Sequence, residues 1–558
     1  MNGKAAWAHL RQAAAKFPSS EGGNIAMIFS MTLVPLIFMA GAAVDYSGAA
    51  NLKTRLQRAT DGANMQLCQM PAISTQAQLT TAAQKYVAAY MDGRPFAIDS
   101  VVPTTDPRQI QLTTSANFAT KIVKAVNANF AIVPVKASAK CFSQQQTFEI
   151  ALVLDNTGSM ANSSGGVSKL QAMKTAATNF VNSVFADPGM AGYTKMSLVP
   201  FAATAAVSPG TYRTASWIDL QGKASNHWSF LQGGASAVAA YASSGIRNRF
   251  DVFNYLKGTV ASWDWNGCFE ALPYPLNTQD GSPTSSNLNS YYVPMFAPDE
   301  SGDGGQYSHT AGGSTVYSAN SYMNDTNGGC SPTSDEATRT GQACKYVTVT
   351  NPQTSGGLGP NYSCTTRPIT RETTSQSTLT SEISAMTANG NTNIHEGMMW
   401  GWRTLSPVSV FADGSPYNKP YNNKVIVLMS DGMNTWNDQP TNYLKSIYSA
   451  YGFFKNPDGS TSNSRVPSAN AGISTATQSR AAIDALTLEA CSNARGAGLI
   501  IYTVGFSVSS DPIDSQGLNV LRQCAGNDSQ FFVATDASTI DSVFQRIAQS
   551  IGQLRLSM

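Results

Sequence analysis

Charge is scarce in this 558-residue chain. Asp, Glu, Lys and Arg together make up 13% of its residues, against about 25% in an average soluble domain. The formal net charge is only +2, without the basic excess that is typical of nucleic-acid-binding proteins, so we expect no nucleic-acid partner. Hydrophobic residues make up 42% of the chain, which excludes a wholly disordered protein. Neutral polar residues take the place of the missing charge.

The usual signatures of enzymes are also missing. The chain has four histidines, and the pair His395-Glu396 lacks the second histidine, four residues on, that a zinc protease helix requires. No Gly-x-Ser-x-Gly elbow and no Gly-x-x-x-x-Gly-Lys-Ser/Thr phosphate loop occurs. His395 is more consistent with a structural role, although its position near Thr392 also allows one beside the site described below. We therefore expect a protein that is not an enzyme.

A long apolar segment lies near the amino terminus. Residues 1–22 carry three basic side chains and no acid before Glu21, and the stretch Ile25–Val44 holds no ionisable residue. About 20 apolar residues suffice to span a bilayer as a helix. The basic flank predicts a cytoplasmic segment at 1–22, a transmembrane anchor at 23–45 and the remainder outside. The alternative is a cleaved signal peptide, for which Ala40–Ala42 offers small residues.

The eight cysteines all follow this segment, and none forms a Cys-x-x-Cys pair. The absence of this spacing excludes the common zinc sites. An even number of cysteines in an exported chain indicates disulfides. Scattered buried thiols are the alternative, and the pattern alone does not decide the connectivity. The cysteines are Cys68, Cys141, Cys268, Cys330, Cys344, Cys364, Cys491 and Cys524.

Two patterns follow the anchor. Residues 46–146 predict a helix that continues from the anchor, a second helix at Ala77–Met91 and three short strands, which together form a small α+β unit. From 147 to 551, apolar strands alternate with amphipathic helices. This alternation predicts an α/β fold with a doubly wound, mostly parallel sheet. The expected strands are Thr147–Leu154, Lys195–Phe201, Lys424–Ser430, Leu499–Phe506 and Ser529–Ala534.

A large insertion, residues 202–377, interrupts this pattern. It contains four tryptophans and four of the eight cysteines, and it is too long for a loop without structure of its own. We expect a folded, disulfide-stapled subdomain there. Within it, Asp299, Glu300 and Asp303 are interpreted as a solvated acidic turn rather than a Ca²⁺ site. The polar stretch Asn434–Ser479 is expected to be a long surface loop.

Oxygen-bearing side chains follow two of the predicted strands. Asp155, Thr157 and Ser159 alternate directly after the first strand, Asp431 follows the third, and Thr392 precedes a helix. In parallel sheets the carboxyl ends of the strands meet at one edge, where ligands bind. Carboxylates and hydroxyls are suited to a hard divalent cation, so we predict a Mg²⁺ site, with Mn²⁺ or Ca²⁺ as alternatives. The other interpretation is a capped strand-to-helix turn, because Asp, Ser and Thr are natural N-caps.

This arrangement resembles the von Willebrand factor type A domain and its metal-ion-dependent adhesion site (MIDAS). That family has Asp-x-Ser/Thr-x-Ser after the first strand, a later Thr, and an Asp after a central strand, which match Asp155, Thr157, Ser159, Thr392 and Asp431. The resemblance covers about 147–201 and 378–551. It implies a metal with an open coordination position, which an Asp or Glu of a protein partner fills. Because the insertion precedes the Thr392 loop, we expect it to overhang the metal.

The amino-terminal segment resembles the TadE/TadG-like region of bacterial tight-adherence (Flp-type) pilus assembly systems. The residues that carry this resemblance are Gly23–Ala26, Pro35, Gly41–Asp45 and Arg55–Ala63. In such relatives, the positions of Cys491 and Cys524 flank the fourth strand, which makes a disulfide between them plausible.

This second resemblance implies a single-pass protein of the bacterial inner membrane whose bulk is periplasmic or extracellular. Its partners would be pilus or pilus-assembly proteins, bound through the metal. The alternative is a secreted or surface-exposed metal-dependent adhesin that is not tied to pilus assembly.

Overall fold

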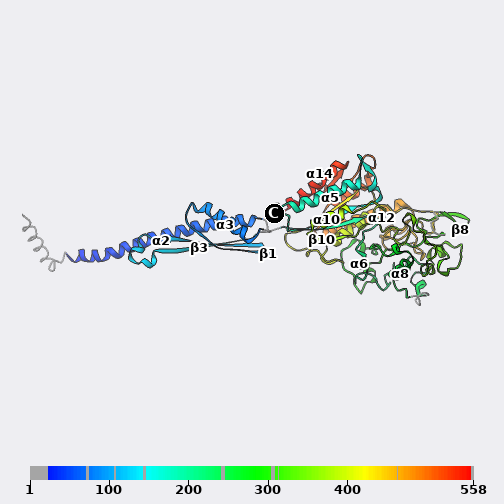
Figure 1. Ribbon diagram of the computed structural model, residues 1–558, viewed down its shortest axis with the longest axis horizontal. Helices are drawn as coiled ribbons and strands as arrows, with labels where there is room; N and C mark the ends of the chain where they lie inside the picture. Colours follow the sequence, from blue (N-terminus) through cyan, green and yellow to red (C-terminus); the bar gives the residue numbers. More distant parts are fainter. Residues whose placement is uncertain are drawn as a thin grey trace, which may run out of the picture. The chain divides into compact units, whose positions relative to one another are not determined.

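The chain folds into two compact units, residues 1–145 and 146–558 (Figure 1). The computed structural model describes residues 23–70, 74–105, 108–142, 146–239, 245–302, 308–311, 313–461 and 463–554. The predicted cytoplasmic segment 1–22 therefore lies outside the described residues, as does Asp303. Each unit is described by itself below.

The first unit is built on one long helix, α2 (Gly23–Gln69, 47 residues), which contains Pro35. Within the described part of the chain, α2 is the one helix long and apolar enough to cross a membrane. Its first half exposes large apolar side chains, with Ile25 at 75% and Val34 at 69%. Its second half buries one face, through Leu52, Leu56, Ala59, Ala63 and Leu67. The predicted continuation of the apolar segment as a single helix is confirmed.

The second half of α2 packs with α3 against a three-stranded antiparallel sheet in the order β1-β2-β3. A capping box between Thr75 and Gln78 begins α3, and a disulfide between Cys68 and Cys141 ties the end of α2 to β3. The predicted α+β elements are present, with strands longer than expected. The elements are α3 (Gln76–Met91), β1 (Ala97–Thr105), β2 (Arg108–Ala119), α4 (Val123–Val126), η2 (Ala128–Phe130) and β3 (Ile132–Phe142).

The second unit contains a six-stranded sheet in the order β10-β7-β4-β11-β12-β13. Five strands pair in parallel, and they are the five apolar runs that predicted strands. The sixth, β10, pairs antiparallel with β7, so the sheet is mixed, and β10 lies inside the range expected to be insertion. The strands are β4 (Thr147–Asp155), β7 (Thr194–Phe201), β10 (Thr370–Thr373), β11 (Asn422–Ser430), β12 (Ile500–Phe506) and β13 (Phe531–Ala534).

Helices contribute to the cores on both faces of this sheet. On one face lie α5 (Lys169–Ala186), α10 (Gln376–Ser384) and α14 (Ala537–Leu554). On the other lie α11 (Ile394–Leu405), α12 (Ala476–Gly496) and α13 (Ser515–Ala525). The disulfide between Cys491 and Cys524, which the resemblance made plausible, joins α12 to α13.

The residues between β7 and β10 add short elements and many aromatic side chains to the α11 face. Trp217 packs on Phe269 at 5.1 Å between ring centroids, and Phe269 packs on Trp400 of α11 at 6.0 Å. This region therefore shares one hydrophobic core with the sheet. Its four cysteines pair as Cys268–Cys364 and Cys330–Cys344, which confirms the predicted disulfides. Its longer elements are α6 (Pro209–Tyr212), α7 (Ala235–Ala239), α8 (Arg249–Thr259), β8 (Ser308–Ala311), β9 (Ser314–Tyr317) and α9 (Glu336–Gly341).

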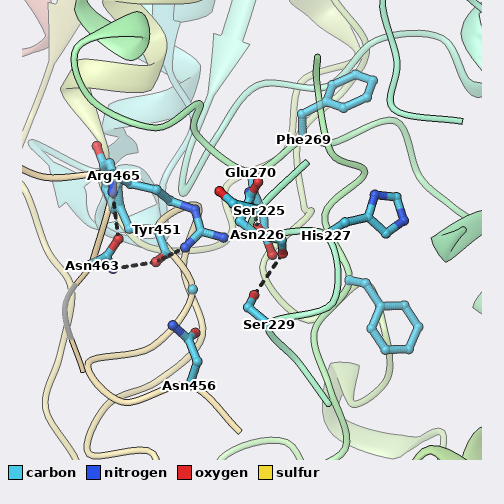
Figure 2. A network of polar contacts seen from close by, with 12 residues as sticks. Ser225, Asn226, His227, Ser229, Phe269, Glu270, Tyr451, Asn456, Asn463 and Arg465 are labelled. Carbon is cyan, nitrogen blue, oxygen red and sulfur yellow. Dashed lines mark hydrogen bonds and ion pairs between the residues drawn. The ribbon is translucent and has the colours of Figure 1, made fainter. Parts of the chain in front are cut away.

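The expectation that Asn434–Ser479 is a surface loop is wrong. Tyr451 and Arg465 of this segment are buried, and the Arg465 guanidinium contacts Glu270 (Figure 2). Glu270 also binds Arg249 at 2.7 Å. Burial opposes the ionisation of Glu270, but the two guanidinium groups outweigh it and lower its pKa to about 2. The polar residues of the segment thus serve as internal hydrogen-bonding partners, which composition does not distinguish from solvated ones.

The interpretation of Asp299 and Glu300 as a solvated turn is also wrong, because both side chains are fully buried. Asp299 pairs with the ammonium of Lys345 at 2.8 Å, and Glu300 accepts hydrogen bonds from the backbone N–H of Ala319 and the amide of Asn442. Burial raises the pKa of Asp299 to about 6 and that of Glu300 to about 7. The two carboxyl groups hold the aromatic-rich region together from inside.

Candidate metal centre

The turn after β4 positions the first predicted ligand. Asp155 is the last residue of β4, and its side chain is fully buried. The backbone N–H of Thr157 donates to Asp155 Oδ1 at 2.8 Å, and the hydroxyl of Ser430 donates to Asp155 Oδ2 at 2.7 Å. Because Ser430 ends the neighbouring strand β11, the Asp155 carboxylate lies between the ends of two parallel strands.

A chain of hydroxyl groups links this turn to Asp431. Thr157 Oγ1 and Ser159 Oγ are 3.1 Å apart, and Ser159 Oγ donates to Asp431 Oδ1 at 2.8 Å. Thr157 and Asp431 are almost completely buried, at 1% and 3% exposure. The structure therefore brings four of the five predicted site residues together at the carboxyl edge of the sheet.

The fifth residue, Thr392, belongs to a loop that is bonded to the same turn. Three hydrogen bonds join the two segments: the Asn156 side chain to the Thr387 carbonyl, Asn389 N–H to the Asn156 carbonyl, and Gly158 N–H to the Gly390 carbonyl. A Cβ placed on Gly432 would lie 3.4 Å from Thr392 Oγ1 and 3.9 Å from Ser159 Oγ. Both hydroxyls thus approach the backbone beside Asp431.

The sequence analysis missed a cation at this edge. Lys169, the first residue of α5, is completely buried, and its ammonium binds Asp431 Oδ2 at 2.8 Å and Asp511 Oδ2 at 2.5 Å. A lysine in the first helical turn opposes the helix dipole. That unfavourable position is the one local feature that sets this lysine apart, and it does not identify the partners.

The electrostatics of the two carboxyl groups favour a cation. Burial, and to a smaller extent the nearby Asp431, raise the pKa of Asp155 to about 7. Burial likewise raises the pKa of Asp431, against the attraction of Lys169. Two buried carboxyl groups that share an edge are difficult to ionise together, and a bound divalent cation would relieve that cost.

The donor set fits a hard divalent cation, since every side chain in it offers oxygen. Within the described residues no cluster of three or more His, Cys, Asp or Glu side chains is suited to a metal, so a cation here depends on two carboxylates supplemented by hydroxyls and water. The capped-turn interpretation is less suitable. The N-cap of α5 is Ser168, whose hydroxyl accepts from Gln171 N–H, and Thr157 caps nothing with its side chain.

His395 lies apart from these ligands. Its Nδ1 is 2.8 Å from the Tyr451 hydroxyl, and its Nε2 is 2.9 Å from the Asn277 carbonyl. Because a carbonyl can only accept, Nε2 carries the proton and Nδ1 accepts from Tyr451. Burial, reinforced by the charge of Arg403, lowers the pKa of His395 to about 3. This neutral histidine connects the start of α11 to the Asn434–Ser479 segment, which is the structural role that the sequence favoured.

Residues 23–63 match a protein family described as "Putative Flp pilus-assembly TadE/G-like". The amino-terminal part of the chain therefore carries a TadE/G-like pilus-assembly domain, which confirms the resemblance seen in the sequence. The comparison with curated proteins gave no significant match.

Several solved pilus proteins are similar to the chain. The vWF domain of the type V pili tip protein Mfa5 from Porphyromonas gingivalis is 11% identical, with 73% of this chain and 96% of that chain covered and a TM-score of 0.32. The PilB minor pilin from Streptococcus sanguinis is 10% identical, with 82% and 78% covered and a TM-score of 0.30. An adhesive tip pilin from Group B Streptococcus agalactiae is 13% identical, with 73% and 100% covered and a TM-score of 0.30.

Proposed function

We propose that this protein is a membrane-anchored, periplasm-facing component of tight-adherence (Flp-type) pilus assembly that binds a protein partner through a divalent cation. The role is non-enzymatic. In this proposal the second unit is a doubly wound type A domain with a large insertion, and Mg²⁺ is the cation.

The proposed location is supported by the amino-terminal segment. The TadE/G-like match at residues 23–63 coincides with the apolar half of α2 and its continuation into the first unit. A helix that exposes large apolar side chains over this length is suited to a bilayer. The basic residues of segment 1–22 favour a cytoplasmic amino terminus by the positive-inside rule, with the residues that follow the span on the outer side of the inner membrane.

The observation that carries the proposed binding activity is the convergence of Asp155, Thr157, Ser159 and Asp431 at one edge of the sheet, with Thr392 beside them. A divalent cation bound there would supply a Lewis-acidic position for a carboxylate of the partner. The chain's own residues hold the oxygens in place: Ser430 orients Asp155, and Lys169 orients Asp431.

Metal binding is tested with Asp155→Ala and the isosteric Asp155→Asn. Both should lose Mn²⁺ binding, measured by calorimetry and by paramagnetic resonance, and should keep the circular dichroism spectrum. Asp528→Ala is the matched control, because Asp528 is 80% exposed in its side chain and pairs only loosely with Arg522, at 3.4 Å. Wild-type Mn²⁺ affinity in both Asp155 variants would refute the site.

The cellular role is tested by fractionation and capture. We expect an amino-terminal tag to stay with the inner membrane, and a pilus protein to co-purify in Mg²⁺ but not in chelator or with Asp155→Ala. Release of the chain from the inner membrane, or capture of no pilus protein, would contradict the proposal. The first result would favour the alternative of a secreted or surface-exposed adhesin.

A further inference from the structure

The connection between β2 and β3, residues 120–131, lies beside the end of the apolar half of α2. Asp45 of α2 accepts hydrogen bonds from the backbone N–H groups of Lys121, Ile122 and Val123, at 2.9, 2.8 and 2.8 Å. A Cβ placed on Gly41 would lie only 2.3 Å from Ile122 Cγ2. The side chain of Ile122 therefore rests directly on the helix at Gly41, where only glycine leaves room for it.

That contact fixes the position of the β2–β3 connection along the axis of α2. Ile25–Val44 would be about 30 Å long at about 1.5 Å per residue, which matches the hydrocarbon core of a bilayer. Gly41 lies about 5 Å inside the outer end of this segment, by the same rise per residue. If Ile25–Val44 spans the membrane, Ile122 lies level with the last turn of the span.

The side chains in and next to the connection are suited to the membrane boundary at the last turn of the span. Ile122, Phe130 and Ile132 are exposed by 38%, 55% and 58%, and the side chains of Lys121 and Lys124 are exposed beside them. Large apolar side chains next to lysines are typical of segments that lie at the boundary between acyl chains and headgroups. In such segments the long lysine side chains can extend to place their ammonium groups among lipid phosphates.

Asp45 joins the β2–β3 connection to α2 by hydrogen bonds. Its side chain is only 4% exposed at the edge of the apolar segment, where an ionised carboxylate without partners would be costly. The three backbone N–H groups supply those partners, and they come from the same residues that carry Ile122 and Lys121. Ile122 is thus held at a fixed position along α2.

We propose that Ile122, Phe130 and Ile132 form a membrane-docking surface that inserts into the acyl–headgroup boundary of the bilayer spanned by α2, with Lys121 and Lys124 at the lipid phosphates. The inference rests on the proposed anchoring of the chain. Lipid is favoured over a protein partner because the Gly41 contact places this surface level with the span itself. The docking would hold the first unit against the membrane at a second point.

The test uses the full chain in lipid nanodiscs with a single environment-sensitive fluorophore. All eight native cysteines are paired in disulfides, so one added cysteine is labelled selectively. Phe130→Cys reports on the docking surface. Phe142→Cys is the matched control, because it is 62% exposed and lies at the other end of β3, about 30 Å away at about 3.3 Å per residue. Val34→Cys reports on the span.

The expected result is a blue-shifted emission at position 130 that is quenched by lipids with a quencher high on the acyl chain, and no quenching at 142. Quenching at 34 but not at 130, or equal quenching at 130 and 142, would overturn the docking surface and leave the anchor intact. Absence of quenching at 34 would overturn the anchor and the docking surface together.

Discussion

Lys169 places its ammonium group between Asp431 and Asp511 at the edge of the candidate metal centre. The side chains of Lys169 and Asp431 are both fully buried, whereas that of Asp511 is 37% exposed. Asp431 therefore depends on Lys169 for its counter-charge whenever no other cation is bound. A divalent cation beside Asp431 would share that task with the lysine.

Lys169→Met should destabilise the metal-free protein by about 3 kcal/mol, because it leaves a buried carboxyl group without its partner. Mg²⁺ should then raise the melting temperature of the variant more than that of the wild type, as measured by calorimetric melting with and without the cation. Lys257→Met is the control: the side chains of Lys257 and Asp264 are 39% and 38% exposed and lie 3.2 Å apart, so its loss should cost at most about 1 kcal/mol. Equal Mg²⁺ shifts in wild type and Lys169→Met would contradict this account.

The proximity of the five candidate site residues could be predicted from the sequence, and the burial of Lys169 beside them could not. Asp155 and Asp431 directly follow apolar runs that predict strands, and parallel strands bring their carboxyl ends to one edge. A lysine, by contrast, is usually solvated. Lys169 is buried with its ammonium group between Asp431 and Asp511, which lie 262 and 342 positions away, and no local pattern indicates such distant partners. The binding of a cation at this site, and its identity as Mg²⁺, stay predictions.

His395 makes the stability of the protein dependent on pH. Its pKa is about 3 in the folded chain and about 6.5 in an unfolded one. Above pH 6.5 the imidazole is neutral in both the folded and the unfolded chain, and its full contribution to stability is present. Below pH 6.5 the unfolded chain binds a proton at this imidazole and the folded chain does not. Because of this group, the free energy of unfolding should fall by about 1.4 kcal/mol for each unit by which the pH is lowered below 6.5.

Urea unfolding from pH 7 to pH 4 measures this effect. In His395→Gln, the free energy of unfolding should depend less steeply on pH, by up to one proton, than in the wild type. The buried His227, whose pKa is also lowered by burial, contributes equally to both curves and cancels from the comparison. Parallel curves would show that His395 is not the responsible group.

At the level of elements, helix α11 lies unusually close to the sheet. A Cβ on Gly401 would be 2.4 Å from Val153 Cγ2 of β4, and one on Gly397 would be 2.6 Å from the ring of Phe201. These contacts bring the start of α11, and with it the Thr392 loop, against the strand ends that carry Asp155. The two glycines therefore contribute to the spacing of the candidate site.

Gly401→Ala should destabilise the protein by about 1–2 kcal/mol, since overpacking costs more than the improved helix propensity returns. Gly258→Ala is the matched control. Gly258 also lies in a helix, α8, but a Cβ there meets nothing within 4 Å, so the same change should be neutral or stabilising by up to about 1 kcal/mol. Chemical denaturation of both variants measures the difference, and a stabilised Gly401→Ala would refute the close contact.

The elements that could be predicted are those whose pattern is local. β4, β11 and β12 are continuous apolar runs because both of their faces are buried, and α2 is the continuation of an apolar helix. β10 was not predicted because Thr370–Thr373 is a short polar stretch at the sheet edge. The burial of the Asn434–Ser479 segment was not predicted because its buried Trp436, Tyr448 and Tyr451 follow neither helical nor strand spacing.

At the scale of the molecule, the two units are internally complete. Each cluster of buried apolar residues in the described chain lies within one unit, and each disulfide joins two residues of the same unit. Residues 146–558 should therefore fold alone.

Produced under oxidising conditions, this fragment should unfold in one cooperative transition and bind Mn²⁺ with the affinity of the full chain. Thermal melting and calorimetry measure both properties. A fragment that lacks a cooperative transition would show that the second unit requires the first.

Helix α2 also has a mechanical consequence. Its 47 residues form a rod about 70 Å long at about 1.5 Å per residue, and its second half is held by the β1–β3 sheet and by the Cys68–Cys141 disulfide. Because α2 is continuous, a load on the β1–β3 sheet would pass into the apolar half of the helix without crossing a loop. Pro35 interrupts the ladder of backbone hydrogen bonds, and bending under load is therefore concentrated within the apolar half.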